Sequence, residues 1–323
     1  MNSNIKSFLD SNRITYEVNV DLKKKTWIHR GGLADIFITP SDSNELEIVV
    51  RFLYICNIKF LLVGHTSNIY ILNECNIPVV VSTAKCRYYM LENDRLFCEC
   101  GVGVINLSRQ MLKQGIRGFE YLTGLPGTIG AALVNNSSCK ENSISELLIS
   151  ARVVLRNGEI MTFSSDDFRY EYRNSAFKSK DIEGIIVSAV LKALPGDPVI
   201  MQRVAANNDT ERQILLEGNA QNLGCTVNKC FINGKMPLHL RIAVRFNSLI
   251  SRLFIFSEVK RREQRKRFIC TIAGYKEIVP YVSSKNMVIF RWVDDGADAA
   301  FPLYLEFMKK VYKTDKLEIE VIM

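Results

Sequence analysis

Two short segments rich in small residues decide how this sequence folds. The first is Gly64-His65-Thr66-Ser67-Asn68, directly after the apolar run 60–63, and the second is Gly124-Leu125-Pro126-Gly127-Thr128-Ile129-Gly130-Ala131. Such segments leave backbone amides and hydroxyls accessible with almost no side-chain bulk, as a main chain that wraps a diphosphate requires. Neither segment matches a P-loop or a GxGxxG dinucleotide turn. The pair predicts a cofactor that is held from two sides.

Length and composition bound the class of protein. With 323 residues the chain exceeds one ordinary hydrophobic core, so we expect two or three domains. Hydrophobic residues make up 47% and charged residues 24%, which is typical of a folded soluble protein. No apolar stretch approaches the roughly 20 residues of a membrane span, and the polar N-terminus lacks an apolar signal core. We therefore expect a cytoplasmic protein without a membrane partner.

Cysteine, histidine and charge counts narrow the kinds of site. The nine cysteines lack a CxxC pair and the three histidines lie far apart, so we expect reduced thiols and no metal site. The net charge of +8 favours anionic ligands, and its densest part is the basic run 260–267. That run is either a solvated face or a site for phosphate or nucleic acid. Because no aromatic residue interleaves with it, we expect no nucleic-acid partner.

The first third of the chain predicts an α/β arrangement. Residues 34–39 alternate as a strand, and Asp42 with Glu45 forms a capping box that begins a helix. The apolar stripe of this helix falls on Leu46, Val49, Val50 and Leu53. A buried strand over 60–63 then leads into the first glycine loop. Ligands of such sheets bind at the strand ends.

Further strands and helices are predicted on both sides of the second loop. The pattern predicts a strand over 96–100, a helix over 104–114 that Gly115 ends, a hairpin around Asn157-Gly158 and a strand over 184–194. The segment Pro195-Gly196-Asp197-Pro198 is the best domain boundary in the chain. Beyond it the pattern predicts a polar helix over about 199–217, a helix over 298–313 with Pro302 in its first turn, and a closing strand over 317–322.

Seven segments then occur in one order along the chain. They are Gly31-Gly32-Leu33-Ala34-Asp35, Gly64 to Asn68, Gly118-Phe119-Glu120-Tyr121-Leu122-Thr123 with the second glycine loop, Tyr172-Arg173-Asn174-Ser175-Ala176-Phe177-Lys178, Gly224-Cys225-Thr226, Val282-Ser283-Ser284-Lys285, and Leu317-Glu318-Ile319-Glu320-Val321. In this order they resemble the UDP-N-acetylenolpyruvoylglucosamine reductase (UDP-N-acetylmuramate dehydrogenase) family, flavoenzymes of peptidoglycan precursor synthesis and cell wall biogenesis.

The resemblance implies an α+β protein with four regions. After an N-terminal segment (1–21), an FAD-binding domain of the PCMH or vanillyl-alcohol-oxidase type would cover 22–195. A smaller C-terminal α/β substrate domain would cover 196–316, and a last strand (317–323) would pack back on the N-terminal region. FAD held non-covalently by two amide-rich loops needs no Rossmann fingerprint, and none is present.

The reaction implied by the resemblance has two steps. NADPH reduces FAD, and a hydride then passes to the methylene carbon of the enolpyruvyl ether of a UDP-amino sugar. Negative charge builds on the carboxylate side, so the step needs a fixed cationic group there and an acid for the adjacent carbon. Arg173 matches the family's catalytic arginine, and its planar guanidinium suits this charge. The alternative is an arginine that pairs with Asp166 or Asp167.

Two further residues match catalytic positions of the family. Glu320 matches the C-terminal glutamate that supports the enol or proton delivery, with Glu318 on the same strand face as the weaker candidate. Cys225 stands where the family usually carries a serine proton donor, and a thiol is the stronger acid. The alternative for Cys225 is a buried structural cysteine.

The resemblance also assigns binding residues. Cofactor contacts fall on Gly64, His65, Thr66, Ser67, Asn68, Gly124, Gly127, Thr128, Gly130 and Asn136, and substrate contacts on Tyr172, Lys178 and Lys229. A histidyl–flavin bond at His65 is conceivable in the wider superfamily, but this family binds FAD non-covalently. For an isolated glycine loop, the alternative is a tight turn.

The departures from the family pattern cluster on the substrate side. Only the asparagine of its NAGAYG-like segment survives at Asn136, and the lysine expected at 228 is asparagine. Asn286 and Met287 stand within the altered segment that follows Lys285. We therefore expect a monomeric, NADPH-dependent flavoprotein oxidoreductase. The alternative is a paralogue of the same fold. Such a paralogue would act on another nucleotide sugar or hydroxy acid in surface polysaccharide synthesis, or would bind flavin without catalysis.

Overall fold

The computed structural model describes residues 2–216, 221–227 and 236–323 and divides into two compact units. The first comprises 1–22, 32–66 and 74–210, and the second comprises 23–31, 67–73 and 211–323. Two short N-terminal segments thus group with the C-terminal part of the chain. The functional domains predicted over 22–195 and 196–316 stay a prediction.

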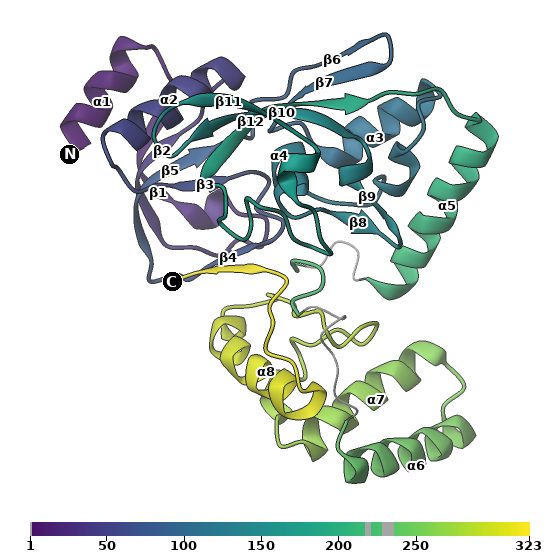
Figure 1. The fold of residues 1–323 in the computed structure, drawn as a ribbon. Coiled ribbons are helices and arrows are strands. Elements are labelled where there is room, and N and C mark those ends of the chain that lie inside the picture. Colours follow the sequence, from purple (N-terminus) through teal and green to yellow (C-terminus); the bar gives the residue numbers. More distant parts are fainter. Residues whose placement is uncertain (1, 217–220, 228–235) are drawn as a thin grey trace. The chain divides into compact units, whose positions relative to one another are not determined.

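A four-stranded sheet in the order β1-β2-β5-β3 begins the first unit (Figure 1). Strands β1 and β2 are antiparallel, whereas β2, β5 and β3 run parallel. Helices α1 and α2 share one buried apolar core with this sheet. The bounds are α1 (Asn2–Ser11), β1 (Tyr16–Asp21), β2 (Leu33–Ile38), α2 (Ser43–Ile55), β3 (Leu61–Val63) and β5 (Asn76–Ser82).

The capped helix predicted after Asp42 is confirmed as α2. The Asp42 carboxylate accepts hydrogen bonds from the amides of Asn44 and Glu45 at 2.8 and 2.9 Å. The Glu45 carboxylate in turn accepts from the Ser41 amide, one residue before the cap. The predicted apolar positions 46, 49, 50 and 53 are all buried. Paired caps of this kind satisfy amides that the first helical turn leaves without partners.

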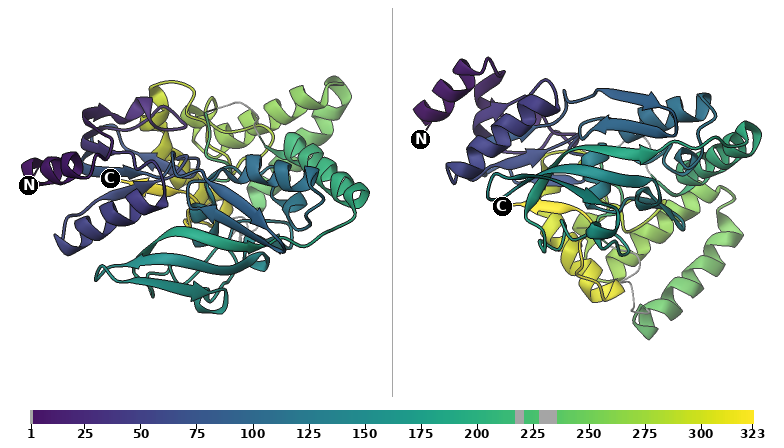
Figure 2. Two further views of the ribbon diagram at one scale, coloured as in Figure 1. Left: turned by 90° about the horizontal axis from the view of Figure 1, so that it is seen from above. Right: turned by 45° about the horizontal axis from the view of Figure 1, so that its top comes forward.

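A five-stranded antiparallel sheet in the order β11-β10-β12-β7-β6 completes the first unit (Figure 2). The hairpin predicted at Asn157-Gly158 joins β10 to β11, and Gly158 adopts a left-handed φ of 84°. Helices α3 and α4 share a core with this sheet. The bounds are β6 (Tyr89–Glu92), β7 (Arg95–Glu99), α3 (Val104–Lys113), α4 (Ile129–Val134), β8 (Ser138–Cys139), β9 (Asn142–Ser143), β10 (Leu148–Leu155), β11 (Ile160–Ser164) and β12 (Gly184–Lys192).

The second unit is mainly helical around an aromatic core. Trp292, Phe290 and Tyr304 are fully buried there, and Phe290 lies edge-on to Trp292. A parallel pair of short strands, β4 and β13, joins residues 251 positions apart in sequence. The polar helix α5 begins in the first unit and ends in the second. The bounds are β4 (Ile69–Ile71), α5 (Pro198–Leu215), α6 (Leu238–Phe254), α7 (Glu258–Ile272), α8 (Gly296–Tyr312) and β13 (Glu320–Ile322).

The position predicted for Pro302 is wrong. Helix α8 begins at Gly296, two residues before the predicted start, so Pro302 lies inside the helix rather than in its first turn. Proline has no amide hydrogen, so the carbonyl of Asp298 receives no helical hydrogen bond from it.

Among the described residues, no helix is both long and apolar enough to cross a bilayer.

Candidate functional site

The two glycine loops meet within the first unit. A Cβ placed on Gly64 would lie 2.7 Å from Oγ1 of Thr128 and 3.0 Å from its Cγ2. The backbone of the first loop therefore lies directly against a side chain of the second, and a side chain at Gly64 would force Thr128 to shift. The amide of Val104, the first residue of α3, donates to the Gly127 carbonyl at 3.0 Å. This hydrogen bond ties the second loop to the start of α3. Gly124 stands half-buried in the same loop.

A third glycine segment, Gly101-Val102-Gly103, completes this cluster and was missed in the sequence. A Cβ on Gly103 would lie 3.1 Å from Cε1 of His65, and Gly103 bridges to Thr128. A Cβ on Gly101 would overlap the Thr83 carbonyl oxygen, at 1.8 Å. The available signal was a pair of glycines immediately after a strand, because that is where ligands meet such sheets.

Helix α4 is seated on the same segment. The amides of Ile129 and Gly130 donate to the carbonyls of Val102 and Cys100 at 2.9 and 2.8 Å. A Cβ on Gly130 would lie 2.9 Å from the Cβ of Cys100, so a side chain there would push the helix away. Thr128, which precedes the helix, is only 2% exposed. The first glycine loop, the segment Gly101-Val102-Gly103 and the second glycine loop thus pack together. We call these three segments the cradle, and they carry little side-chain bulk.

His65 contributes an imidazole ring at the edge of the cradle. The ring is exposed to solvent on one side and lies against Gly103 on the other. Partial burial, and then the charge of Arg87, lower the pKa of His65 from its ordinary value. The ring is therefore neutral at pH 7 and can donate or accept a hydrogen bond. The neighbouring Thr66 hydroxyl donates to the His65 carbonyl at 2.8 Å.

The far end of α4 leads from the cradle to the segment that contains Arg173. Asn136 is buried, and its amide nitrogen donates to the Glu171 carbonyl at 2.8 Å. Its Oδ1 accepts no hydrogen bond from any described residue. The Ser175 hydroxyl donates to the Val134 carbonyl at 2.6 Å. These hydrogen bonds therefore connect the second glycine loop, through α4, to the segment that contains Arg173.

Arg173 itself is held in an uncommon conformation. Its φ of 56° is left-handed, which costs energy for a residue with a side chain. The Arg173 guanidinium donates to the Ser138 carbonyl at 3.3 Å and lies 6.0 Å from the ring centre of Tyr172. The Lys178 ammonium donates to the Arg173 carbonyl at 2.9 Å. Both predicted substrate residues of this segment, Tyr172 and Lys178, thus contact Arg173.

Asp167, one of the two alternative partners considered for Arg173, is engaged elsewhere. The Asp167 carboxylate accepts hydrogen bonds from the amide and the hydroxyl of Ser164 at 2.7 and 2.6 Å. These hydrogen bonds lower the pKa of Asp167. The Asp167 carboxylate therefore caps a local turn.

Cys225 lies in the second unit on a segment held by its neighbour Thr226. The Thr226 amide donates to the Val288 carbonyl at 2.9 Å, and its hydroxyl accepts from the Phe290 amide at 3.2 Å. The Thr226 carbonyl accepts from the Glu318 amide at 2.9 Å. Cys225 is partly buried and packs against the aromatic core. This packing agrees with the structural alternative and leaves part of the residue accessible to a ligand.

Glu320 stands on β13 beside the end of the first glycine loop. Its amide donates to the Asn68 carbonyl at 2.9 Å, and the Asn68 side chain donates to the Glu318 carbonyl at 3.1 Å. Glu320 is exposed, Ile319 is buried and Glu318 is half-buried, which matches the predicted alternation. Ser67, also of the second unit, is half-buried.

Two lysines on the substrate side of the family pattern remain, Lys229 and Lys285. Lys229 lies outside the described residues. The ammonium of Lys285 donates to the carbonyls of Gln213 and Leu216 at 2.9 and 3.1 Å, so it stabilises the end of α5. Among the described residues, no group of histidine, cysteine and acidic side chains could hold a metal ion.

The part of the chain that contains the cradle is similar in sequence to known proteins. Residues 34–164 match the family model described as an FAD binding domain. The chain is 31% identical over 187 residues to UDP-N-acetylenolpyruvoylglucosamine reductase of Exiguobacterium sibiricum, covering 58% of this chain and 61% of the relative. It is 30% identical over 190 residues to the enzyme of that name from Streptococcus mutans, covering 59% and 61%. Over this region the chain is similar in sequence to UDP-N-acetylenolpyruvoylglucosamine reductases, and residues 34–164 form an FAD-binding domain.

A solved structure extends the likeness of the fold. The crystal structure of UDP-N-acetylenolpyruvylglucosamine reductase from Thermus caldophilus superposes with a TM-score of 0.66 at 18% identity, over 96% of this chain and 99% of that one. The predicted α+β fold with an FAD-binding domain is thereby confirmed. The sequence matches span about three fifths of the curated relatives, at 61% of their length.

Proposed function

We propose that this protein is a cytoplasmic, monomeric flavoenzyme that uses NADPH to reduce the enolpyruvyl ether of a UDP-amino sugar. The product of UDP-N-acetylenolpyruvoylglucosamine would be UDP-N-acetylmuramate. The observation that carries the proposal is the contact of Gly64 with Thr128, because it joins both glycine loops into one cradle inside the segment that matches an FAD binding domain. The names of the relatives support the substrate class.

The cradle fits the diphosphate of FAD on physical grounds. Side chains at Gly64 and Gly130 would collide with Thr128 and Cys100, so glycine at both positions lets the loops pack closely and keeps side-chain bulk low. The buried Oδ1 of Asn136, which no described residue satisfies, is available to a bound donor. Bound non-covalently, FAD would supply a hydride acceptor and donor for the reaction.

Arg173 is the residue that we propose to stabilise negative charge on the substrate carboxylate. Its guanidinium is permanently charged and presents a planar fork to a carboxylate. The left-handed backbone and the hydrogen bonds from Lys178 and to Ser138 hold the residue before substrate binds. A charge fixed in advance needs little reorganisation during the reaction.

Cys225 and Glu320 are proposed for proton delivery. A partly accessible thiol at Cys225 can give a proton to a carbon more readily than an alcohol. The exposed Glu320 carboxylate would orient the substrate or return the proton to the thiol. Arg173 belongs to the first unit and the other two residues to the second, so all three assignments rest on each residue's own surroundings and on the family pattern.

The test separates cofactor reduction from substrate reduction. The purified protein should show a flavin absorption band, which NADPH should bleach without oxygen and UDP-N-acetylenolpyruvoylglucosamine should restore. Arg173→Lys should slow the restoring step by about a hundredfold and leave bleaching unchanged. Arg169→Lys is the matched control, because Arg169 lies four residues earlier, shares the left-handed backbone and is exposed. A colourless protein, or equal effects of both variants, would contradict the proposal.

A second substrate is favoured by one observation. Lys285, part of a motif shared with the family, is committed to two backbone carbonyls, and the neighbouring segment 286–289 departs from the family pattern. The alternative is therefore an oxidoreductase of the same fold for another nucleotide sugar or a hydroxy acid. If NADPH bleaches the flavin but the UDP-enolpyruvyl sugar fails to restore it, this alternative is supported. Absence of turnover with every donor and acceptor would indicate a flavin-binding protein without catalysis.

A further inference from the structure

Helix α6 presents an unusual apolar face to solvent. Leu238, Ile242, Phe246, Leu249 and Leu253 are each between 60% and 72% exposed. At 100° per residue these five positions fall within one quarter of the helix circumference. The buried residues Leu240, Val244 and Ser251 lie on the opposite side, which packs on the rest of the unit. Isolated exposed apolar residues are ordinary, but a continuous stripe of this size marks an interaction surface.

The apolar stripe continues beyond the end of the helix. Phe254 is 76% exposed, Phe256 in the connection to α7 is 90% exposed, and Val259 at the start of α7 is 73% exposed. The Arg261 guanidinium donates to the Ile255 carbonyl at 3.1 Å and fixes the turn between the two helices. Exposed apolar side chains thus extend from α6 through the connection to the start of α7.

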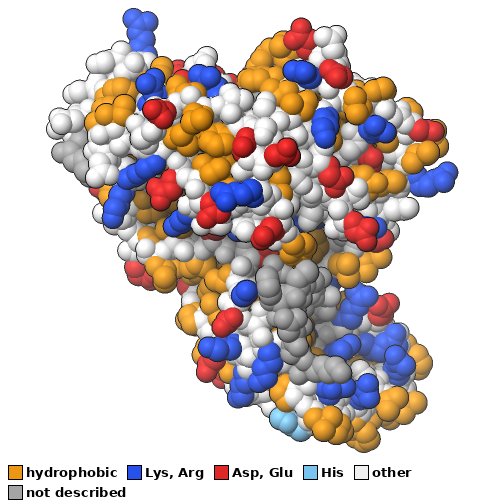
Figure 3. Space-filling view, viewed as in Figure 1, with side chains coloured by type: hydrophobic (Ala, Val, Ile, Leu, Met, Phe, Trp, Pro, Cys, Tyr) orange, Lys and Arg blue, Asp and Glu red, His pale blue; other side chains and the backbone are white. Residues whose placement is uncertain are grey.

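Positive charge borders this stripe and no negative charge interrupts it on α6. Arg241, Arg245 and Arg252 fall on one flank of α6, and the helix contains no acidic residue. Residues 238–272 together hold nine lysines and arginines against two glutamates, so +7 of the chain's net charge of +8 arises here. In Figure 3, lysine and arginine side chains gather over α6 and α7, with hydrophobic side chains at the outer edge.

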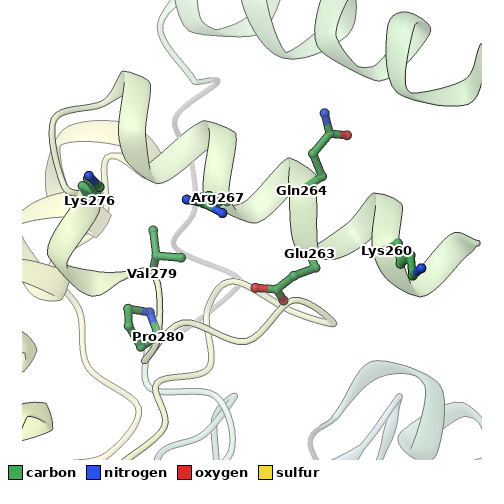
Figure 4. A pocket seen from close by; sticks show the side chains of 7 residues that line it. All are labelled: Lys260, Glu263, Gln264, Arg267, Lys276, Val279 and Pro280. Carbon is green, nitrogen blue, oxygen red and sulfur yellow. The ribbon is translucent and has the colours of Figure 1, made fainter. Parts of the chain in front are cut away.

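Two grooves are lined by these cations, and one of the grooves adjoins the stripe. The first, of about 330 Å³, is lined by Arg245, Arg252 and Arg265, and by Leu249 of the stripe itself. The second, of about 460 Å³, runs along α7 (Figure 4). Lys260 and Arg267 line it from the helix and Lys276 from the segment that follows, together with Glu263, whose carboxylate pairs with Lys266 at 2.6 Å.

We propose that the α6–α7 pair binds the surface of a membrane that contains anionic phospholipids. The apolar stripe would enter the boundary between headgroups and acyl chains, while the flanking arginines contact lipid phosphates. Charge complementarity selects this occupant, because a second copy of the chain would bring the same cations face to face. The expectation of no membrane partner rests on the lack of a segment long enough to cross a bilayer, but a helix lying in the interface needs no such length.

Vesicle binding by the full-length protein tests this proposal. The protein should sediment with vesicles of phosphatidylglycerol and phosphatidylcholine, and far less with phosphatidylcholine alone. The double variant Phe246→Ser/Leu253→Ser should weaken binding at least tenfold at fixed salt, and so should Arg245→Gln/Arg252→Gln. The control Lys59→Gln/Lys113→Gln removes two exposed charges of the first unit and should bind as the parent does.

Three results would overturn the proposal. One is absence of binding to any vesicle by protein whose circular dichroism shows it to be folded. Another is equal loss in the control variant, which would indicate a general charge effect. The third is a dimer in light scattering that the Phe246→Ser/Leu253→Ser variant converts to a monomer, which would assign the stripe to a second copy.

Discussion

Replacing Gly64 with alanine tests the contact between the two glycine loops. The added methyl would lie 2.7 Å from Oγ1 and 3.0 Å from Cγ2 of Thr128, closer than the usual 3.5–4.0 Å by roughly 0.5–1 Å. Thr128 is 2% exposed, so its side chain has no free space to move into. The φ of Gly64 is not left-handed, so backbone strain adds nothing.

The expected cost follows from these distances. Overpacking of a closely packed site typically costs 1–3 kcal/mol, and we expect about 2 kcal/mol here. Part of this strain would appear as lost FAD affinity, by about tenfold for each 1.4 kcal/mol that the cofactor must overcome. Gly103→Ala provides the contrast, because its methyl would meet only the movable His65 ring at 3.1 Å. That variant should change stability by less than about 0.5 kcal/mol.

A double-mutant cycle identifies the colliding partner. Thr128→Ala removes both close atoms and leaves the Thr128 Cβ at 3.5 Å, an ordinary contact. The double variant Gly64→Ala/Thr128→Ala should therefore be about 1–2 kcal/mol more stable than the sum of the single effects predicts. Urea unfolding of the FAD-free protein and flavin titration measure the two quantities. Additivity within about 0.5 kcal/mol would refute the reasoning.

Three other predictions concern the framework around the cradle. Asp42→Ala should lower the free energy of unfolding in urea by about 1 kcal/mol, since two amides of α2 lose their acceptor, whereas Ser11→Ala should have little effect. Glu99→Ala should cost about 2–4 kcal/mol in the same assay, because the buried carboxylate accepts from the amides of Ser43 and Tyr88, and a similar loss in the exposed Glu92→Ala would contradict this. Burial, with Glu99 and Asp42 nearby, raises the pKa of Cys86 to about 12. A raised pKa means less thiolate, so at pH 8.5 the native protein should react with a disulfide reagent at the exposed Cys56 and not at Cys86 until it is denatured.

Local signals allowed several elements to be predicted from the sequence. The capping residues Asp42 and Glu45 determine where α2 begins, and Asn157-Gly158 determines the hairpin, because each acts through neighbouring backbone groups. The glycine loops were found for the same reason. Gly101 and Gly103 were missed because their importance depends on Thr83 and His65, which are distant in sequence.

Helix α6 could not be predicted from periodicity. Its apolar residues occupy both the buried side, at Leu240 and Val244, and the exposed side, at Ile242 and Phe246. A helix that is apolar around most of its circumference has no single stripe for the pattern to reveal. Likewise, the sequence gives no sign that Lys285 is used by backbone carbonyls at the end of α5, since that contact depends on how the second unit folds.

The pairing of β4 with β13 has a consequence for biosynthesis. Residues 69–71 emerge early from the ribosome, but the strand that covers them is completed only at residue 322. Until then Tyr70 and Ile71, which are buried in the folded protein, lack their partner. Long-range pairing of this kind slows folding and prolongs the exposure of apolar segments. A fragment that ends at residue 210 would keep the cradle and yet carry this uncovered strand, so such fragments should aggregate unless the C-terminal strand is supplied as a peptide.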